Sequence, residues 1–212
     1  VKLSGRNIHA NAMSIAEYLG LDATERAITT LKFNYSYGMS IIHSHLACGA
    51  SLVLTESSVT TPGFWPMFEA QGATSFAGVP YIFEMLDRTS DWAAQPNLRY
   101  VTQAGGRLAP DIVRRMAELG QGHGWRFFVM YGQTEASPRM TYLPPEHAID
   151  HPDSIGRAVP GGSLSLIDET GAAITSPETA GELIYAGPNV MMGYAEGPAA
   201  LAADETPDSL KT

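Results

Sequence analysis

An aromatic ring, an amide, a hydroxyl and a carboxylate stand together at residues 131–135, which read Tyr-Gly-Gln-Thr-Glu. Four apolar residues, 127–130, come directly before them, and so short an apolar run is typical of a buried strand. In open α/β sheets, ligands bind beyond the carboxyl ends of the strands. The ring of Tyr131 offers a stacking face, and the oxygens of Thr134 and Glu135 suit a hard cation such as magnesium. The motif therefore predicts a binding edge, although an ordinary surface turn also explains these five residues taken alone.

A regular alternation of strands and helices surrounds this motif. Strand-like stretches are centred near Leu52, Phe76, Tyr100 and Val129, and each interval between them holds a helical pattern. This order predicts a parallel sheet with right-handed crossover helices. The helices are expected over residues 6–20, 40–47, 64–71, 80–86 and 110–119.

Three turns that contain glycine follow these predicted strands, at residues 78–80, 104–107 and 131–133. Because parallel strands end at the same edge of a sheet, we expect the three turns to lie side by side. Glycine lets a backbone approach a ligand closely, so the turns should form a cleft. Their convergence favours a functional site over a plain surface turn at residues 131–135.

The pattern changes after about Pro144, where proline and glycine become frequent and helical spacing disappears. Residues 163–167 alternate between polar and apolar, 168–171 can turn, and 181–185 return, which predicts an antiparallel β unit. We therefore expect residues 1–144 to form an α/β sheet subdomain and residues 145–212 to begin a small β-barrel subdomain. The tail from Gly197 to Thr212 has little to bury.

The composition is that of an ordinary globular protein, with 44% hydrophobic and 17% charged residues in 212. A net charge of −9 argues against a nucleic-acid surface, which needs clustered Lys and Arg. The single cysteine, Cys48, excludes an internal disulfide and fits a reducing compartment. No apolar run approaches a membrane span of roughly 18 residues, and no signal peptide is recognisable. These observations predict a cytoplasmic protein, and the absence of an initial methionine suggests a piece of a longer one.

Several other catalytic signatures do not occur in the sequence. We find no P-loop, no Gly-x-Ser-x-Gly elbow and no Gly-x-Gly-x-x-Gly turn, which weakens a hydrolase and a dinucleotide oxidoreductase. His43 and His45 would point to different sides of a helix, which disfavours a metal pair. His147 and His151 have helical spacing, but neighbouring prolines make a long helix there improbable.

Taken in order, the motifs resemble those of the adenylate-forming superfamily, which includes acyl-CoA synthetases, peptide-synthetase adenylation domains and luciferases. Residues 131–135 are similar to the family's Tyr-Gly-x-Thr-Glu motif, and residues 181–194 to its Gly-Glu-Leu…Gly…Val…Gly-Tyr motif. Further similarity covers residues 36–40, 49–54, 79–80, 98–108 and 156–161. The resemblance implies an internal part of the large N-terminal domain, without the family's phosphate loop, its ribose-binding aspartate or its small C-terminal domain.

The resemblance implies an activity in two steps. A carboxylic acid would attack ATP to form an acyl-adenylate with release of pyrophosphate, and the acyl group would pass to the thiol of coenzyme A or of a carrier protein. Glu135 would bind Mg²⁺ and Thr134 the α-phosphate region. The residues expected to bind nucleotide are Gly105, Gly106, Arg107, Tyr131, Gly132, Gln133 and Thr134, with Tyr131 stacked on adenine. The residues expected to line the acyl pocket are Tyr37, Gly38, Val79, Tyr81 and Gly132.

The nature of the acid is indicated by residues 33–40. Amino-acid-activating members of the family place an aspartate there, and this chain has no acid in the segment. Because an unpaired ammonium is costly to bury, we favour a fatty or aromatic acid over an amino acid. Two alternatives stay open, namely acyl or amino-acid adenylation for a carrier protein and a catalytically inactive nucleotide-binding scaffold. We also expect the 212-residue piece alone to be inactive.

Overall fold

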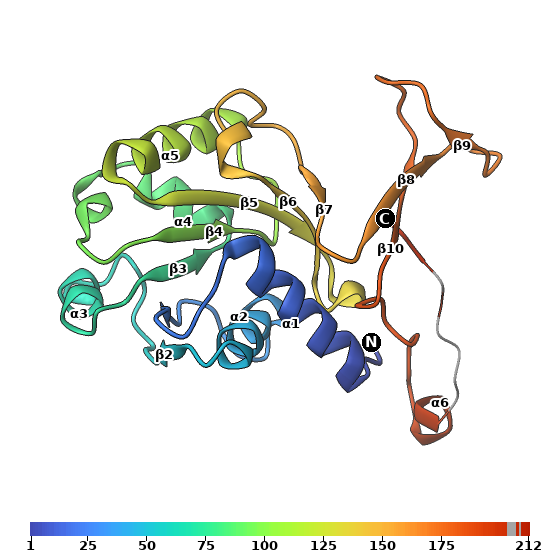
Figure 1. The fold of residues 1–212 in the computed structure, drawn as a ribbon, viewed down its shortest axis with the longest axis horizontal. Helices are drawn as coiled ribbons and strands as arrows, with labels where there is room; N and C mark the ends of the chain where they lie inside the picture. The colour runs from blue at the N-terminus through green and yellow to red at the C-terminus, as the bar shows by residue number, and fades with distance from the viewer. Residues whose placement is uncertain (203–206, 208) are drawn as a thin grey trace.

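The computed structural model describes residues 1–202, 207 and 209–212, and a seven-stranded sheet forms its centre (Figure 1). The strand order is β2-β1-β3-β4-β5-β6-β7. The strands are β1 (Arg26–Ile28), β2 (Ser51–Val53), β3 (Ser75–Gly78), β4 (Tyr100–Gln103), β5 (Arg126–Gly132), β6 (Arg139–Leu143) and β7 (Arg157–Ala158).

The strands from β2 to β5 in this order run parallel, which confirms the predicted β–α alternation. The predicted strands are β2, β3, β4 and β5. Three further strands were not predicted. The short β1 lies between β2 and β3, and β6 and β7 add two antiparallel strands, so the sheet is mixed and not purely parallel.

Helices cover both faces of this sheet (Figure 1). One face is covered by α3 (Phe64–Ala70), α4 (Pro80–Leu86) and α5 (Pro110–His123), whose apolar side chains pack with the sheet in one core cluster. The other face is covered by α1 (Gly5–Leu19) and α2 (Ser36–Ala47), which contribute to a second cluster. Helix α2 begins four residues before its predicted start, because Tyr37 and Gly38 are already buried in its first turn.

Local signals in the sequence explain where the long helices begin and end. Ser4 and Asn7 form a capping box at the start of α1, and Gly20 takes a left-handed conformation directly after its last residue. Pro110 stands in the first turn of α5, where its missing N–H is tolerated, and Gly124 follows the end of that helix.

A second, smaller sheet follows, with strand order β11-β10-β8-β9 and antiparallel pairing throughout. Its strands are β8 (Ser163–Ile167), β9 (Ala173–Ile174), β10 (Glu182–Ala186) and β11 (Leu210–Lys211). The predicted antiparallel unit is thereby confirmed. The division at residue 144 stays a prediction, since β7 still belongs to the first sheet. Part of the predicted tail, residues 203–206 and 208, lies outside the described residues, while Leu210 is buried in β11.

The segment after β10 returns to the end of β5 and connects the two sheets. Asn189 is buried there, and its side-chain amide donates to the carbonyl oxygens of Ala136 (2.6 Å) and Arg139 (2.8 Å). Ser137 donates to the carbonyl oxygen of Asn189 (2.8 Å) in return. The turn after β5 is therefore held by residues about 50 positions later in the chain.

Candidate active site

The three glycine turns do lie at one edge of the sheet, because β3, β4 and β5 are parallel neighbours. In the middle turn, Gly105 has φ +85°, and a β-carbon added there would meet Val79 Cγ1 at 3.3 Å and collide with the Tyr35 hydroxyl. The Gln103 side chain donates to the Gly106 carbonyl oxygen (2.9 Å) and holds the turn. A backbone this closely packed needs glycine at residue 105.

Thr134 and Glu135 begin a short 3₁₀ helix, η2 (Thr134–Ala136), directly beyond the end of β5. The exposed Thr134 hydroxyl lies 3.0 Å from the hydroxyl of Ser36, at the start of α2. The Glu135 carboxylate accepts a hydrogen bond from Tyr194 (2.9 Å), and its backbone carbonyl accepts one from the Met191 amide (2.8 Å). Both side chains therefore present oxygen atoms at the surface of this edge.

A cavity of about 660 Å³ opens between the middle turn and the last residues of β5. It brings together Gly105, Gly106, Arg107, Tyr131 and Gly132, five of the seven residues expected to bind the nucleotide, whereas Gln133 and Thr134 do not line it. The cavity is also lined by residues 152–155, which sequence reasoning did not place in the site. Their role as a base-binding slot stays a prediction that this arrangement supports.

A second cavity, of about 70 Å³, shares Gly105 and Gly132 with the first. Tyr37, Gly132, Gln133 and Thr134 line it, so residues expected for the acyl pocket and for the nucleotide meet here. The other lining residues are Tyr35, Ser36, Ala104, Gly105, Pro138 and Arg139.

The remaining acyl-pocket candidates, Gly38, Val79 and Tyr81, do not line this cavity. Gly38 is buried in α2 beside Tyr37, and Val79 approaches Gly105. Tyr81 is 64% exposed in the first turn of α4 and lines neither cavity. The pocket role of Tyr81 therefore stays a prediction without support from its position.

Arg139 is a site residue that sequence reasoning missed. It is only 3% exposed, and its guanidinium lies 4.1 Å above the ring of Tyr37. Burial raises the pKa of Tyr37 to about 12, against a smaller opposing effect of Arg139, so the ring carries a neutral phenol. That phenol donates to the Thr102 carbonyl oxygen (2.9 Å). An arginine after a proline reads as a surface loop, and only its antiparallel pairing opposite Gly132 buries it.

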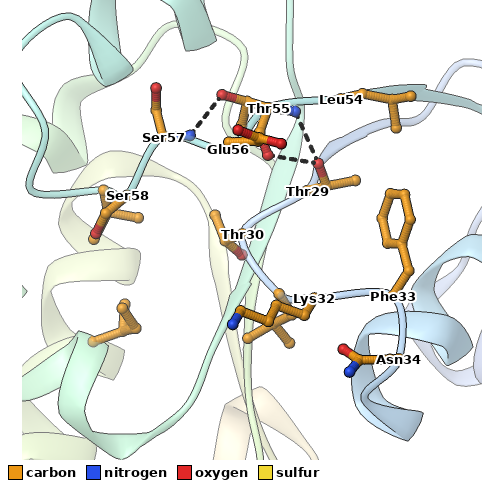
Figure 2. Close-up of a pocket in the computed structure, with 13 residues that line it drawn as sticks. Thr29, Thr30, Lys32, Phe33, Asn34, Leu54, Thr55, Glu56, Ser57 and Ser58 are labelled. Atoms are coloured by element: carbon orange, nitrogen blue, oxygen red, sulfur yellow. Dashed lines mark hydrogen bonds between the residues drawn. The ribbon is translucent and has the colours of Figure 1, made fainter.

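A third cavity, of about 1000 Å³, lies elsewhere, beyond the carboxyl ends of β1 and β2 (Figure 2). It is lined by residues 29–34, 54–59 and Ile82. Figure 2 shows the loop after β2 held to the loop after β1, where the Thr29 hydroxyl accepts from the Thr55 amide (3.1 Å). Residues 32–34 run directly into the lining of the smaller cavity, so the two openings share one loop.

The chemistry of Glu135 is compatible with the proposed binding of magnesium. Within the part of the chain that the structure describes, no group of three or more His, Cys, Asp and Glu side chains could hold a metal ion. Magnesium is typically held by one or two carboxylates together with substrate phosphates, which Glu135 fits. His45 is buried with Nε2 2.8 Å from the Tyr100 hydroxyl, so it serves packing and not metal binding.

Comparison with known proteins establishes the family. The model of the AMP-binding enzyme family matches residues 1–195, and the chain belongs to this family. The oxalate–CoA ligase of Arabidopsis thaliana is 30% identical over 94% of this chain and 39% of its own length. The benzoate–CoA ligase of Thauera aromatica is 28% identical over 93% of this chain and 38% of its own length. The chain thus spans about two fifths of the length of these curated relatives.

Solved structures show the same fold. The o-succinylbenzoate coenzyme A synthetase of Bacillus subtilis in complex with AMP matches 100% of this chain with a TM-score of 0.83 at 22% identity, over 42% of its own chain. The structure of VinN matches 94% of this chain with a TM-score of 0.78 at 27% identity, over 49% of its own chain. The predicted fold class and the family resemblance are confirmed. No helix in the described residues has both the length and the apolar character of a membrane span.

Proposed function

We propose that the full-length protein is an AMP-forming acid–thiol ligase, which activates a carboxylic acid with ATP and transfers the acyl group to coenzyme A. The observation that carries this proposal is that Gly105 and Gly132 line both the cavity of about 660 Å³ and the smaller cavity of about 70 Å³. Thr134, two residues after Gly132, lines the smaller cavity with Tyr37. A nucleotide in the cavity of about 660 Å³ and an acid in the smaller one would meet at Gly105 and Gly132, next to Thr134.

In the first step, a carboxylate oxygen of the acid attacks the α-phosphorus of ATP. The bond from that phosphorus to the bridging oxygen breaks, and pyrophosphate leaves with the bonding electrons. In the second step, the thiol sulfur attacks the acyl carbon, the bond to the AMP oxygen breaks, and the thiol proton passes to solvent. Neither step needs a covalent bond to the protein, so its task is to position the reactants and to neutralise charge.

Thr134 and Glu135 have separate tasks in this proposal. The exposed Thr134 hydroxyl, 3.0 Å from Ser36, would donate to an oxygen of the α-phosphate. The Glu135 carboxylate, oriented by the Tyr194 hydroxyl, would hold Mg²⁺. Bound there, the ion would offset negative charge on the phosphate oxygens. The hydrogen bond to Glu135 raises the pKa of Tyr194, so Tyr194 donates to the carboxylate as a neutral phenol.

The lining of the smaller cavity argues against an amino acid as substrate. None of its ten residues is acidic, so the cavity offers no carboxylate to pair with an α-ammonium group. Leaving such a charge unpaired is costly. We therefore favour an acid without an amino group.

The decisive experiment is carboxylate-dependent ATP–pyrophosphate exchange by the full-length protein, with fatty, aromatic, dicarboxylic and amino acids compared. We expect exchange with one class of non-amino acid, followed by thioester formation when coenzyme A is added. A folded protein that binds ATP and exchanges with no acid would contradict the proposal and favour an inactive scaffold. Transfer to a carrier-protein thiol, and not to coenzyme A, would change only the acceptor.

A further inference from the structure

Arg139 is a buried positive charge that the described residues do not neutralise. Arginine has five N–H donors. One terminal nitrogen donates to the Ser40 hydroxyl (3.0 Å), and the other contacts the Met130 sulfur (2.6 Å), a weak acceptor. Nε has no hydrogen-bond partner. Among the described residues, no carboxylate forms an ion pair with this guanidinium.

Two acidic groups that could be considered as partners are engaged elsewhere. Glu25, a buried carboxylate at the opposite, amino ends of the strands, is paired with Arg99 (2.9 Å). Glu135 accepts from Tyr194. The Tyr37 ring below the guanidinium supplies a cation–π contact, but such a contact does not replace a counter-ion. Burying an unpaired ion costs several kcal/mol even after relaxation, which makes an anionic ligand the natural partner.

The position of Arg139 says where that ligand would bind. Arg139 and Thr134 line the same cavity, so an acid whose reacting carboxylate lies at Thr134 has its other end within this cavity. The cavity holds about 70 Å³, which admits only a few non-hydrogen atoms beyond the reacting group. Its lining contains no acidic side chain that would repel a second negative charge.

We infer that Arg139 binds a second carboxylate of the substrate, and that the protein activates short dicarboxylic acids. This inference rests on the proposed function and narrows it. Arginine binds carboxylate through two parallel N–H···O bonds, and this guanidinium has no carboxylate partner among the described residues and a buried Nε without any hydrogen-bond partner. The apolar tail of a fatty acid carries no charge that could pair with the guanidinium. In the same way, the cavity has no carboxylate that could pair with the ammonium of an amino acid.

The first test uses the unmodified full-length protein and needs no variant. ATP–pyrophosphate exchange is measured with malonate, succinate and glutarate against propanoate, butanoate and pentanoate, which match them in carbon number. We expect kcat/KM to favour the diacid of the best pair by about 100-fold. Exchange that is equal for both series, or that favours the monoacids, overturns this inference and leaves the proposed function standing. Exchange with no acid at all overturns both.

The second test separates recognition from a structural role. Arg139→Met keeps a long side chain and removes the charge, so the ratio of kcat/KM for diacid over monoacid should fall about 100-fold, mainly through KM. Arg126→Met is the matched control, because Arg126 stacks on Phe128 at the other end of β5, away from both cavities, and should keep the ratio. A purely structural role would lower both activities equally and leave the ratio unchanged.

A conservative variant covers the case in which Arg139→Met does not fold. Arg139→Lys keeps the charge but loses the planar fork, so the ratio should fall about tenfold. Thermal unfolding of each variant shows whether it is folded before its kinetics are read. An Arg139→Lys protein with the unmodified ratio would overturn the assignment of bidentate binding.

Discussion

At the amino ends of the parallel strands, the buried Glu25 carboxylate accepts hydrogen bonds from Arg99 (2.9 Å) and Thr74 (2.5 Å). Each of these residues stands directly before a strand. At the opposite edge, Arg139 is equally buried beside Gly132 but has no carboxylate partner within the described chain. In the folded chain, the buried charge of Glu25 is therefore paired, whereas the buried charge of Arg139 is not. In the proposal made above, the ligand supplies the missing partner at the carboxyl ends of the strands.

The largest expected effect is a loss of activity caused by a substitution at the carboxyl ends of the strands. Glu135→Gln in the full-length protein removes the charge proposed to hold Mg²⁺, and we expect adenylation to fall by about 10²–10³-fold, measured by ATP–pyrophosphate exchange. Glu118→Gln on the exposed surface of α5 is the control and should keep normal exchange. Near-normal turnover of Glu135→Gln would remove this residue from the site.

The turn geometry at the same edge gives the next effect. A β-carbon on Gly132 would collide with the carbonyl oxygen of Pro138, so Gly132→Ala must displace the backbone next to Thr134. Displacements of this kind cost about 100-fold in rate, and we expect that loss in the exchange assay. Gly122→Ala in α5 meets open space and should leave exchange unchanged. Equal rates for the two variants would show that the turn is not constrained by Pro138.

The comparison between Glu25 and Arg139 can also be tested through the stability of the folded protein. Glu25→Gln removes a paired charge and should lower the free energy of unfolding by about 1–3 kcal/mol. Arg139→Met removes an unpaired one, and replacing such a charge with an apolar side chain should be close to neutral or stabilising. Thermal unfolding of the full-length variants without ligand measures both. A larger loss for Arg139→Met than for Glu25→Gln would mean that the guanidinium is structurally satisfied.

The smallest expected effect is a pH dependence at the amino end of β4. Burial lowers the pKa of His45 from its usual 6.5, against smaller opposing effects of the Ile41 carbonyl and Glu25. The folded state therefore resists protonation, so its stability is complete above pH 6.5 and falls as the pH drops toward the lowered pKa. We expect the unfolding temperature to fall by about 2–4 °C more for the unmodified protein than for His45→Gln between neutral pH and about pH 5.5. Parallel curves for the two proteins would contradict this.

Strands with long apolar runs could be predicted from the sequence, and those created by pairing could not. β5 follows from its continuous apolar residues. β1 has only three residues and begins with Arg26, while β6 begins with an arginine after a proline, so neither carries a strand pattern. Yet β6 is buried along its whole length, because it pairs with β5 on one side and β7 on the other.

The same distinction applies to the candidate site. Residues 105–107 and 131–134 could be placed together, because strand order alone brings the ends of β4 and β5 to one edge. Arg139 could not, since its burial depends on an antiparallel strand without a sequence signal. Tyr81 was expected in the acyl pocket because of its position in a motif, but its side chain is exposed. The position of a residue in a motif does not determine which way a helical side chain points. Residues 152–155, which line the cavity of about 660 Å³, belong to no motif, so the sequence could not place them in the site.

The hydrogen bonds of Asn189 to Ala136 and Arg139 also determine when the site can form during synthesis. A ribosome makes the chain from its amino end, so the turn after β5 emerges about 50 residues before the side chain that holds it. The delay is longer for the start of α1. The Asn7 side chain there donates to the carbonyl oxygen of Pro188, which is synthesised 181 positions later. We expect a nascent chain that is stalled before Asn189 to contain the strands of the large sheet but not a finished turn at Glu135.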